Sequence, residues 1–189
     1  MTQKIVLNAG SGYTALADSP YGWEFDGWDE LRVDMDSRTR SHIHNNICNM
    51  IGVGSGVVDA VYSCHTLEHL YTSEVLVALK EFYRVLKPGG FVSLYLPDFE
   101  KVAKIILDGN IDRVLYKSSG GPIGPVDIVF GYEGAIKKAP MMMHKTLITE
   151  ALITKRLKKA KFIDIKIEKE PIDLWVKGFK PCAGRSKTK

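Results

Sequence analysis

Long apolar runs are missing from this sequence of 189 residues. No stretch approaches the ~18 consecutive apolar residues that a membrane-spanning helix requires, although hydrophobic residues make up 45% of the chain. The first apolar run, at residues 5–7, is too short for a signal peptide and is typical of a first strand. The chain is long enough for one sizeable core and short for two, so we expect a single domain over 1–189 without membrane insertion.

The chain also has few cysteines and a small net charge. Cys48, Cys64 and Cys182 are odd in number and form no C-x-x-C pair, so neither a disulfide framework nor a thiolate zinc site is indicated. A reducing, cytoplasmic setting follows. The net charge is only +4, and its late lysines are not interleaved with aromatic residues as in a nucleic-acid groove. A solvated surface explains them better than a nucleic-acid partner, and the oligomeric state stays open.

Repeats and low-complexity tracts are absent, and strand and helix patterns alternate instead. Short β-branched runs predict strands at 4–10, 30–36, 57–64 and 91–98. Apolar residues at steps of three and four predict helices within 73–90, 99–110 and 145–162, and alternating runs predict closing strands at 162–170 and 173–180. In the first helix Ser73 is a candidate N-cap and Pro88 ends it. This order predicts an α/β fold, with a mostly parallel sheet covered on both faces.

Polar or glycine-rich residues follow three of the predicted strands. In parallel sheets ligands bind beyond the carboxyl ends of the strands, so these segments should meet at one crevice. Gly10 and Gly12 follow the first strand and let a ligand approach the backbone closely. Asp34, about twenty residues further on, ends the second strand and is placed to accept hydrogen bonds from a ribose. The pattern favours a cofactor that contains a nucleoside.

The third glycine of a dinucleotide fingerprint is absent, because Ala15 stands in its place. Pro20, Gly22 and Gly27 also break the helix that would hold a pyrophosphate. S-adenosylmethionine is a cofactor without phosphates. It needs only a backbone that it can approach closely, a protein carboxylate that binds its ribose, and a pocket for its adenine. A nicotinamide-dependent oxidoreductase stays a weaker alternative.

Four segments carry a family resemblance: VLNAGSG, RVDMD, VDAVYSCHTLEHL and EFYRVLKPGGFVSLYLPD. They resemble successive motifs of the class I S-adenosylmethionine-dependent methyltransferases, and most closely the small methyltransferase type 11 proteins, which are often linked to sugar and cell-surface polysaccharide pathways. The resemblance is strong over about residues 4–100 and weaker beyond. It implies a Rossmann-like three-layer sandwich, whose seven-stranded, mostly parallel sheet has an antiparallel last strand. It also implies S-adenosylmethionine as the cofactor.

The resemblance implies a cofactor site as well. The loop after the first strand would wrap the methionine end, Asp34 would hold the ribose, and residues 63–65 would lie beneath the sulfonium. The implied cofactor-binding residues are Asn8, Ala9, Gly10, Ser11, Gly12, Asp34, Asn46, Ile47, Ser63, Cys64 and His65. The family usually has an acid at the position of Asn8, and the helix that should follow the first strand is short here. Both departures would weaken affinity, and they leave open a non-catalytic cofactor-binding or partner subunit with a degenerate fold.

The letters HTLEH also match the H-x-x-E-H pattern of zinc peptidases. His65 and His69 would be two ligands, and Glu150 could be proposed as the third. However, His65 follows a strand almost at once, so only one histidine of the pair would be helical. The sequence LEH is ordinary in the methyltransferases that the chain resembles, where Glu68 and His69 fix the strand–helix junction. We therefore expect no metal.

Methyl transfer requires the acceptor and the methyl group to be held in line, and an alcohol acceptor also needs a base. The candidate catalytic residues are His65 and His144; Asp98 is a third, although helix capping explains it better. Residues 117–145 are expected to be irregular and to form a substrate-covering loop. The predicted function is methyl transfer from S-adenosylmethionine to a small polar or sugar-derived acceptor.

Overall fold

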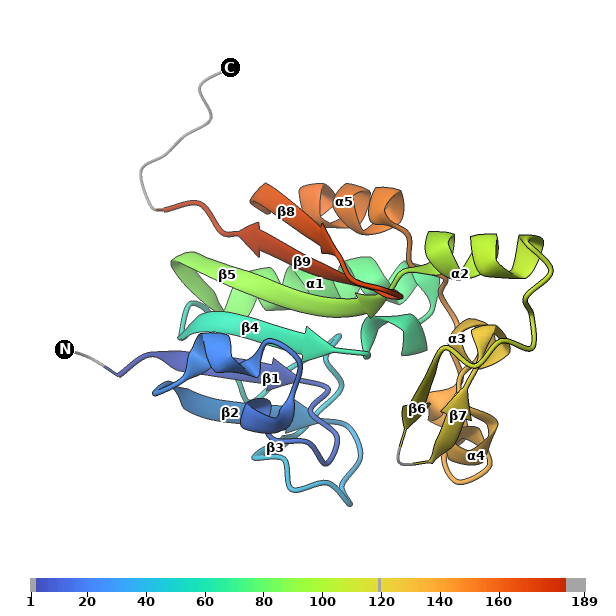
Figure 1. Ribbon diagram of the computed structural model, residues 1–189. Coiled ribbons are helices and arrows are strands. Elements are labelled where there is room, and N and C mark those ends of the chain that lie inside the picture. Colours follow the sequence, from blue (N-terminus) through green and yellow to red (C-terminus); the bar gives the residue numbers. More distant parts are fainter. Residues whose placement is uncertain (1–2, 119, 183–189) are drawn as a thin grey trace.

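A seven-stranded sheet forms the middle of three layers (Figure 1). The computed structural model describes residues 3–118 and 120–182. The strand order is β3-β2-β1-β4-β5-β9-β8. The strands are β1 (Ile5–Ala9), β2 (Asp29–Asp34), β3 (Ile43–His44), β4 (Val58–Cys64), β5 (Leu86–Pro97), β8 (Ile163–Lys169) and β9 (Asp173–Phe179). The predicted three-layer α/β fold is confirmed.

Strand direction places the carboxyl ends of several strands at one edge. β1 pairs in parallel with β2 and β4, β2 with β3, and β4 with β5. β9, the last strand of the chain, lies between β5 and β8 and runs antiparallel to both. The predicted antiparallel last strand is therefore confirmed, and the loops after β1, β2 and β4 meet as expected.

Helix α1 (Thr72–Val85) covers one face of the sheet (Figure 1). Its buried residues recur at helical spacing, and they are Val75, Ala78, Leu79, Phe82 and Val85. The N-cap is Tyr71, whose backbone N–H donates to Glu74 Oε2 at 2.8 Å, so the prediction of Ser73 as the cap was wrong. The strand β5 begins at Leu86, earlier than predicted, because Leu86 already pairs with Val58 of β4.

Two more helices flank the sheet, α2 (Phe99–Leu107) and α5 (Glu150–Lys159). Asp98 caps α2 by accepting a hydrogen bond from the N–H of Lys101 at 3.3 Å, which confirms the capping prediction. α5 starts at Glu150, later than predicted, because the Thr149 side chain caps it through the N–H of Leu152. Within the described ranges no helix is long and apolar enough to cross a membrane.

The other face of the sheet has no α-helix after β1. Two 3-10 turns, Leu16–Asp18 and Gly22–Phe25, cover it instead. Leu16 and Phe25 pack there against Val6, Ala60 and Tyr62. The expectation that glycine and proline shorten the helix after β1 is confirmed, because only 3-10 turns form there. Aromatic side chains fill the space that a longer helix would cover.

Residues 117–145 are not irregular, so that expectation was wrong. The segment holds a hairpin of β6 (Tyr116–Ser118) and β7 (Gly121–Ile123), followed by α3 (Pro125–Phe130), α4 (Glu133–Ile136) and a 3-10 turn at Pro140–Met142. Ile123 and Ile128 pack with Val102 of α2 in a small core of their own. Pro125 fits the first turn of α3, where its missing N–H costs nothing. These short elements lie beside the carboxyl edge of the sheet (Figure 1).

Candidate functional site

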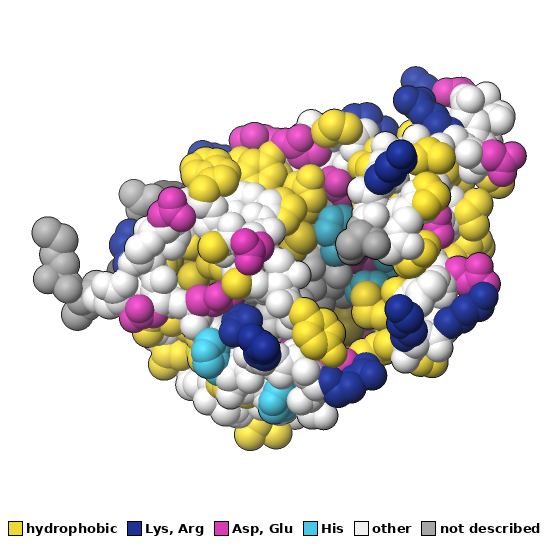
Figure 2. All heavy atoms as spheres, turned by 60° about the horizontal axis from the view of Figure 1, so that its bottom comes forward, with side chains coloured by type: hydrophobic (Ala, Val, Ile, Leu, Met, Phe, Trp, Pro, Cys, Tyr) yellow, Lys and Arg dark blue, Asp and Glu magenta, His cyan; other side chains and the backbone are white. Residues whose placement is uncertain are grey.

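A cavity of about 440 Å³ lies at the carboxyl ends of β1, β2 and β4. Five parts of the chain line it: residues 10–14, 34–35, 46–47, 64–74 and 141–145. Figure 2 shows the surface hollowed on this side of the molecule, with histidine side chains in the hollow. Segments that are far apart in sequence thus form one pocket, at the place where parallel sheets bind ligands.

The loop after β1 leaves its backbone open to this cavity. Gly10 has φ +71°, and a Cβ there would lie 2.2 Å from Thr66 Cγ2, so only glycine lets the turn after β4 pack this closely. Gly12 has φ +52°, and no described atom lies within 4 Å of a Cβ built on it. Between them Ser11 is 6% exposed, and its Oγ has no partner among the described residues. The loop therefore offers an unpaired hydroxyl and uncovered backbone to a ligand.

Asp34 lines the same cavity. Its Oδ2 accepts a hydrogen bond from the N–H of Gly12, and its Oδ1 accepts one from the N–H of Asp36, both at 2.8 Å. Each carboxylate oxygen can accept a second hydrogen bond. The backbone thus holds the carboxylate in place and leaves acceptor capacity for two hydroxyl groups of a ligand.

Asn46 and Ile47 contribute a less polar wall, together with Met35 and Leu70. The segment that carries them is fixed to α1 by Arg84, which donates to the carbonyl oxygens of Met50 and Val53 at 3.2 and 2.8 Å. An apolar wall beside the Asp34 carboxylate suits a flat aromatic base.

Three of the predicted cofactor residues do not line the cavity. Asn8, Ala9 and Ser63 are 3%, 0% and 0% exposed. Ser63 Oγ donates to the carbonyl oxygen of Ala9 at 2.9 Å, which ties the ends of β4 and β1 together. All three lie beneath the cavity wall and support it.

Glu30 is a neighbour of Asn8 that was not predicted from the sequence. Its Oε1 accepts hydrogen bonds from Asn8 Nδ2 at 2.8 Å and from the N–H of Leu16 at 3.1 Å. A carboxylate therefore lies next to Asn8, the position at which the resembled family usually has an acid. Glu30 comes close to Asn8 only because β1 pairs with β2, and this pairing cannot be predicted before the sheet order is known.

His65 lines the cavity and lies between two carboxylates. Its Nδ1 is 3.3 Å from Glu68 Oε1, and its Nε2 is 3.7 Å from Asp173 Oδ1. Burial alone would lower the pKa of this imidazole, but the neighbouring carboxylates of Glu68 and Asp173 outweigh burial and raise the pKa. His65 has φ +45°, a conformation that a non-glycine residue adopts at a cost of roughly 1–3 kcal/mol. The surrounding structure holds this side chain in a strained, specific position.

His144 lies behind this wall. The cavity is lined by Met141, Met142 and Lys145 of the same segment, and His144 is not among the lining residues. Its Nδ1 donates to the carbonyl oxygen of Ile128 at 2.8 Å. Burial lowers the pKa of this imidazole, which favours the neutral form. The ring centroid of His144 is 4.8 Å from that of His69, which does line the cavity.

The ligand set of a zinc peptidase is not assembled. Glu150, the proposed third ligand, pairs with Lys169 at 2.9 Å and lines a different surface depression beside α5. His65 ends up in a left-handed conformation after β4, while His69 ends a 3-10 turn at Leu67–His69. The two histidines therefore do not share the regular helical face that the peptidase motif requires.

Comparisons with known proteins agree with this geometry. Residues 9–94, somewhat less than half of the chain, match the model of a type 11 methyltransferase domain. No curated protein matches the sequence.

Three solved structures show the fold. An S-adenosylmethionine-dependent methyltransferase from Archaeoglobus fulgidus superposes with a TM-score of 0.63 at 13% identity, over 94% of this chain and 86% of that one. Another from Mesorhizobium loti gives 0.61 at 15% identity, over 94% and 91%. A possible exported protein from Bordetella parapertussis gives 0.58 at 15% identity, over 95% of this chain and 63% of that one, so this chain spans less than two thirds of its length. At these identities the likeness shows the fold alone.

The matched domain includes the glycine loop, Asp34 and the turn after β4, which are the parts that build the cavity. The match over residues 9–94 and the sheet order agree with the class I S-adenosylmethionine-dependent methyltransferase that the motifs predicted. S-adenosylmethionine is the cofactor that a methyltransferase domain of this class implies.

The described residues fit this cofactor. The open space over Gly12 and the unpaired Ser11 hydroxyl suit its amino-acid end, Asp34 suits the ribose hydroxyls, and Ile47 suits the adenine. The choice of residues for each part of the cofactor stays a prediction.

Proposed function

We propose that this methyltransferase acts on a small polar or sugar-derived acceptor. The observation that carries the proposal is that one cavity holds both the cofactor loop and five polar side chains, Thr14, Thr66, Tyr71, Glu74 and Lys145. Thr66, Glu74 and Lys145 already form hydrogen bonds within the chain, and each keeps capacity for a further one. A hydroxyl-rich molecule would therefore have hydrogen-bond partners in the cavity.

The proposed cofactor contacts divide into two groups. Gly10, Ser11, Gly12, Asp34 and the segment 46–47 would contact S-adenosylmethionine directly, with Cys64 and His65 closing the floor. Asn8, Ala9 and Ser63 would act from beneath by holding the loop. When bound, the cofactor supplies a methyl group on a sulfonium, already activated for in-line displacement. The protein then has to orient the acceptor and exclude water.

We propose His65 as the base for a hydroxyl acceptor. It lines the cavity, and Asp173 and Glu68 on either side would stabilise the imidazolium that forms when it takes the proton. His144, the second candidate, lies behind the wall with its Nδ1 bound to a backbone carbonyl. In this arrangement His65 is the better placed of the two.

Residues 117–145 are proposed to cover the acceptor. Met141, Met142 and Lys145 already line the cavity, so closure would need only a local movement of α4 and the turn that follows. The single methyltransferase domain would then span 1–189 with this segment as its cover. The lysine-rich face of α5 lies at a separate depression lined by Lys155, Lys158 and Lys159, so it does not favour a nucleic-acid acceptor.

The proposed compartment is the cytoplasm, since Cys48, Cys64 and Cys182 are all free thiols. Alkylation of protein from gently lysed cells would test this: three reactive thiols after denaturation support a reducing compartment, whereas blocked thiols would argue against it.

A turnover assay tests the function itself. Purified protein with S-adenosylmethionine and a panel of sugars, sugar acids and small alcohols should release S-adenosylhomocysteine with at least one acceptor. His65→Asn, which tolerates the left-handed backbone at this position, should lower that rate by roughly 10²- to 10⁴-fold, the usual contribution of a general base, without a comparable loss of cofactor affinity. Binding of the cofactor without turnover on any acceptor of the panel would favour the alternative, a non-catalytic subunit with a degenerate fold.

A further inference from the structure

The carboxylate of Glu68 is buried without a hydrogen-bond partner. The residue is 2% exposed, and neither Oε1 nor Oε2 has a partner within the described part of the chain. His65 Nδ1 comes within 3.3 Å of Oε1 but does not reach hydrogen-bond alignment. A buried carboxylate without a hydrogen bond is costly even beside a histidine, and buried charges are normally hydrogen-bonded or bound to a metal.

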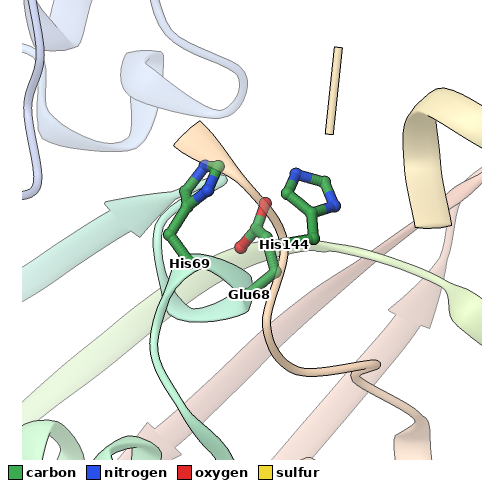
Figure 3. A group of neighbouring side chains, drawn as sticks. All are labelled: Glu68, His69 and His144. Carbon is green, nitrogen blue, oxygen red and sulfur yellow. The ribbon is translucent and has the colours of Figure 1, made fainter. Parts of the chain in front are cut away.

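Two imidazoles flank this carboxylate, as Figure 3 shows. One potential ligand atom each from Glu68, His69 and His144 lie within 4.8 Å of one another. His69 and Glu68 come from the 3-10 turn Leu67–His69, and His144 comes from the segment after the turn Pro140–Met142. That segment is held against the first, because the N–H groups of Lys145 and Thr146 donate to the carbonyl oxygen of Glu68 at 2.8 and 3.1 Å.

Backbone carbonyls fix the tautomer of both histidines. His144 Nδ1 lies 2.8 Å from the carbonyl oxygen of Ile128, and His69 Nδ1 lies 3.3 Å from that of Met143. A carbonyl only accepts, so each Nδ1 carries the hydrogen and each Nε2 keeps its lone pair. Histidine ligands of metals usually show this arrangement, with the second ring nitrogen donating to a carbonyl or carboxylate.

We propose that Glu68, His69 and His144 form a binding site for a divalent transition metal of the zinc class. Two imidazoles and one carboxylate are a ligand set that zinc accepts, and a fourth position then stays open. Ligand atoms on one tetrahedral zinc are about 3.4 Å apart, as follows from bonds of about 2.0–2.1 Å. Binding would therefore draw the three side chains together by about an ångström. The long His69–Met143 contact leaves that ring room to turn.

This site differs from the peptidase set that the sequence suggested. It leaves out His65 and Glu150, and it uses Glu68 as a ligand. His69 also lines the cavity, so the open position of the metal would lie near the proposed acceptor end. There a metal would polarise an acceptor oxygen and tie the segment 140–145 to the cavity wall. The inference does not depend on methyl transfer, since the metal site is tested without cofactor or acceptor.

Titration of the chelator-treated protein with Zn²⁺ and Co²⁺ tests the site. We expect one ion per chain, and a Co²⁺ complex with the strong visible absorption of four-coordinate cobalt. Glu68→Gln and His144→Gln should each weaken Zn²⁺ binding by about 100-fold or more, since even the loss of an outer partner of a metal site costs about 10- to 100-fold. S-adenosylhomocysteine binding by the metal-free protein, measured in parallel, reports separately on the proposed function.

Two control variants distinguish the proposed ligands, Glu68, His69 and His144, from the other histidines. His44→Ala removes an exposed histidine of β3 and should leave Zn²⁺ affinity unchanged. His65→Asn keeps a residue type that tolerates the left-handed conformation, and it should leave Zn²⁺ affinity within a few-fold. Glu68→Gln keeps the shape of the side chain, and the melting temperature of the metal-free variant shows whether it still folds after the loss of the His65–Glu68 ion pair. Absence of stoichiometric binding in the wild type, or binding that these ligand variants do not weaken, would overturn the proposal.

Discussion

Asp34 is the residue whose geometry most directly links the fold to the cofactor. Two backbone N–H groups hold its carboxylate, and both oxygens keep acceptor capacity at the cavity wall. The glycines beside it matter in a different way. Gly10 lets Thr66 approach, and Gly12 leaves the space over the loop open. At this scale we expect Asp34 to bind the ribose hydroxyls, while Gly10 and Gly12 leave room for the ligand.

Replacement of Asp34 by Asn should weaken S-adenosylhomocysteine binding about 10- to 100-fold. The change removes the charge and half of the acceptor capacity, and a charge-assisted hydrogen bond contributes about 1.5–3 kcal/mol. Calorimetric titration measures the change. Asp36→Asn is the matched control, because Asp36 pairs with exposed Arg38 and does not line the cavity. Equal affinities of Asp34→Asn and wild type would remove Asp34 from the cofactor site.

At the scale of elements, the contact between α1 and the segment 46–53 positions the apolar wall of the cavity. Glu81 accepts a hydrogen bond from the N–H of Met50 at 3.0 Å and is bound by Arg84, which also holds the carbonyl oxygens of Met50 and Val53. Arg84, with a smaller contribution from the N–H of Met50, lowers the pKa of Glu81 below its ordinary 4.5, although partial burial opposes this.

Glu81→Gln should therefore destabilise the protein by about 1 kcal/mol at neutral pH, the lower end for a charge-assisted bond, because the pair is partly exposed. The lowered pKa means that the carboxylate stabilises the fold above pH 4.5 and loses this effect as the pH falls through the folded pKa. Urea unfolding from pH 7 to 3 should show the difference between wild type and variant shrinking below about 4.5. The pair of Glu133 and Lys137 is exposed, so Glu133→Gln should show no such pH-dependent loss. A difference that stays constant down to pH 3 would contradict the role of the charge.

The segment 131–142 of the proposed cover is lightly packed. Neither α4 nor the turn Pro140–Met142 has a buried residue, yet Met141 and Met142 line the cavity. We expect its amides to exchange quickly in the free protein and more slowly with S-adenosylhomocysteine, whereas the amides of α1 stay slow in both. Hydrogen exchange read by mass spectrometry measures this. Uniformly slow exchange across 131–142 without ligand would defeat the covering role.

The elements differ in how well the sequence could predict them. β1, β2, β4 and α1 were predictable because their apolar residues follow the spacing of a strand or a helix, and glycine follows β1 directly. β3 has only two residues, and the hairpin β6–β7 contains Pro122 and Gly121, so neither has a periodic signal. Glu68 and His144 lie far apart in sequence, and only the docking of residues 143–146 on the turn 67–69 brings them together. Local pattern therefore predicted the fold and the cofactor loop, and non-local contacts decided the rest.

At the scale of the whole molecule, we propose one domain in which a single cavity serves both cofactor and acceptor. The sheet brings the loops after β1, β2 and β4 to one edge, and residues 116–145 stand beside that edge (Figure 1). The absent third glycine and the 3-10 turns in place of a first helix remove the usual site for a pyrophosphate. The molecule as a whole should therefore distinguish a nucleoside cofactor without phosphates from a dinucleotide.

Isothermal titration calorimetry with S-adenosylhomocysteine and with NAD tests this central claim most directly. We expect binding of one S-adenosylhomocysteine per chain, no measurable binding of NAD, and no displacement of bound S-adenosylhomocysteine by NAD. Saturable binding of NAD at this cavity, or no heat with S-adenosylhomocysteine from a protein that is shown to be folded, would contradict it.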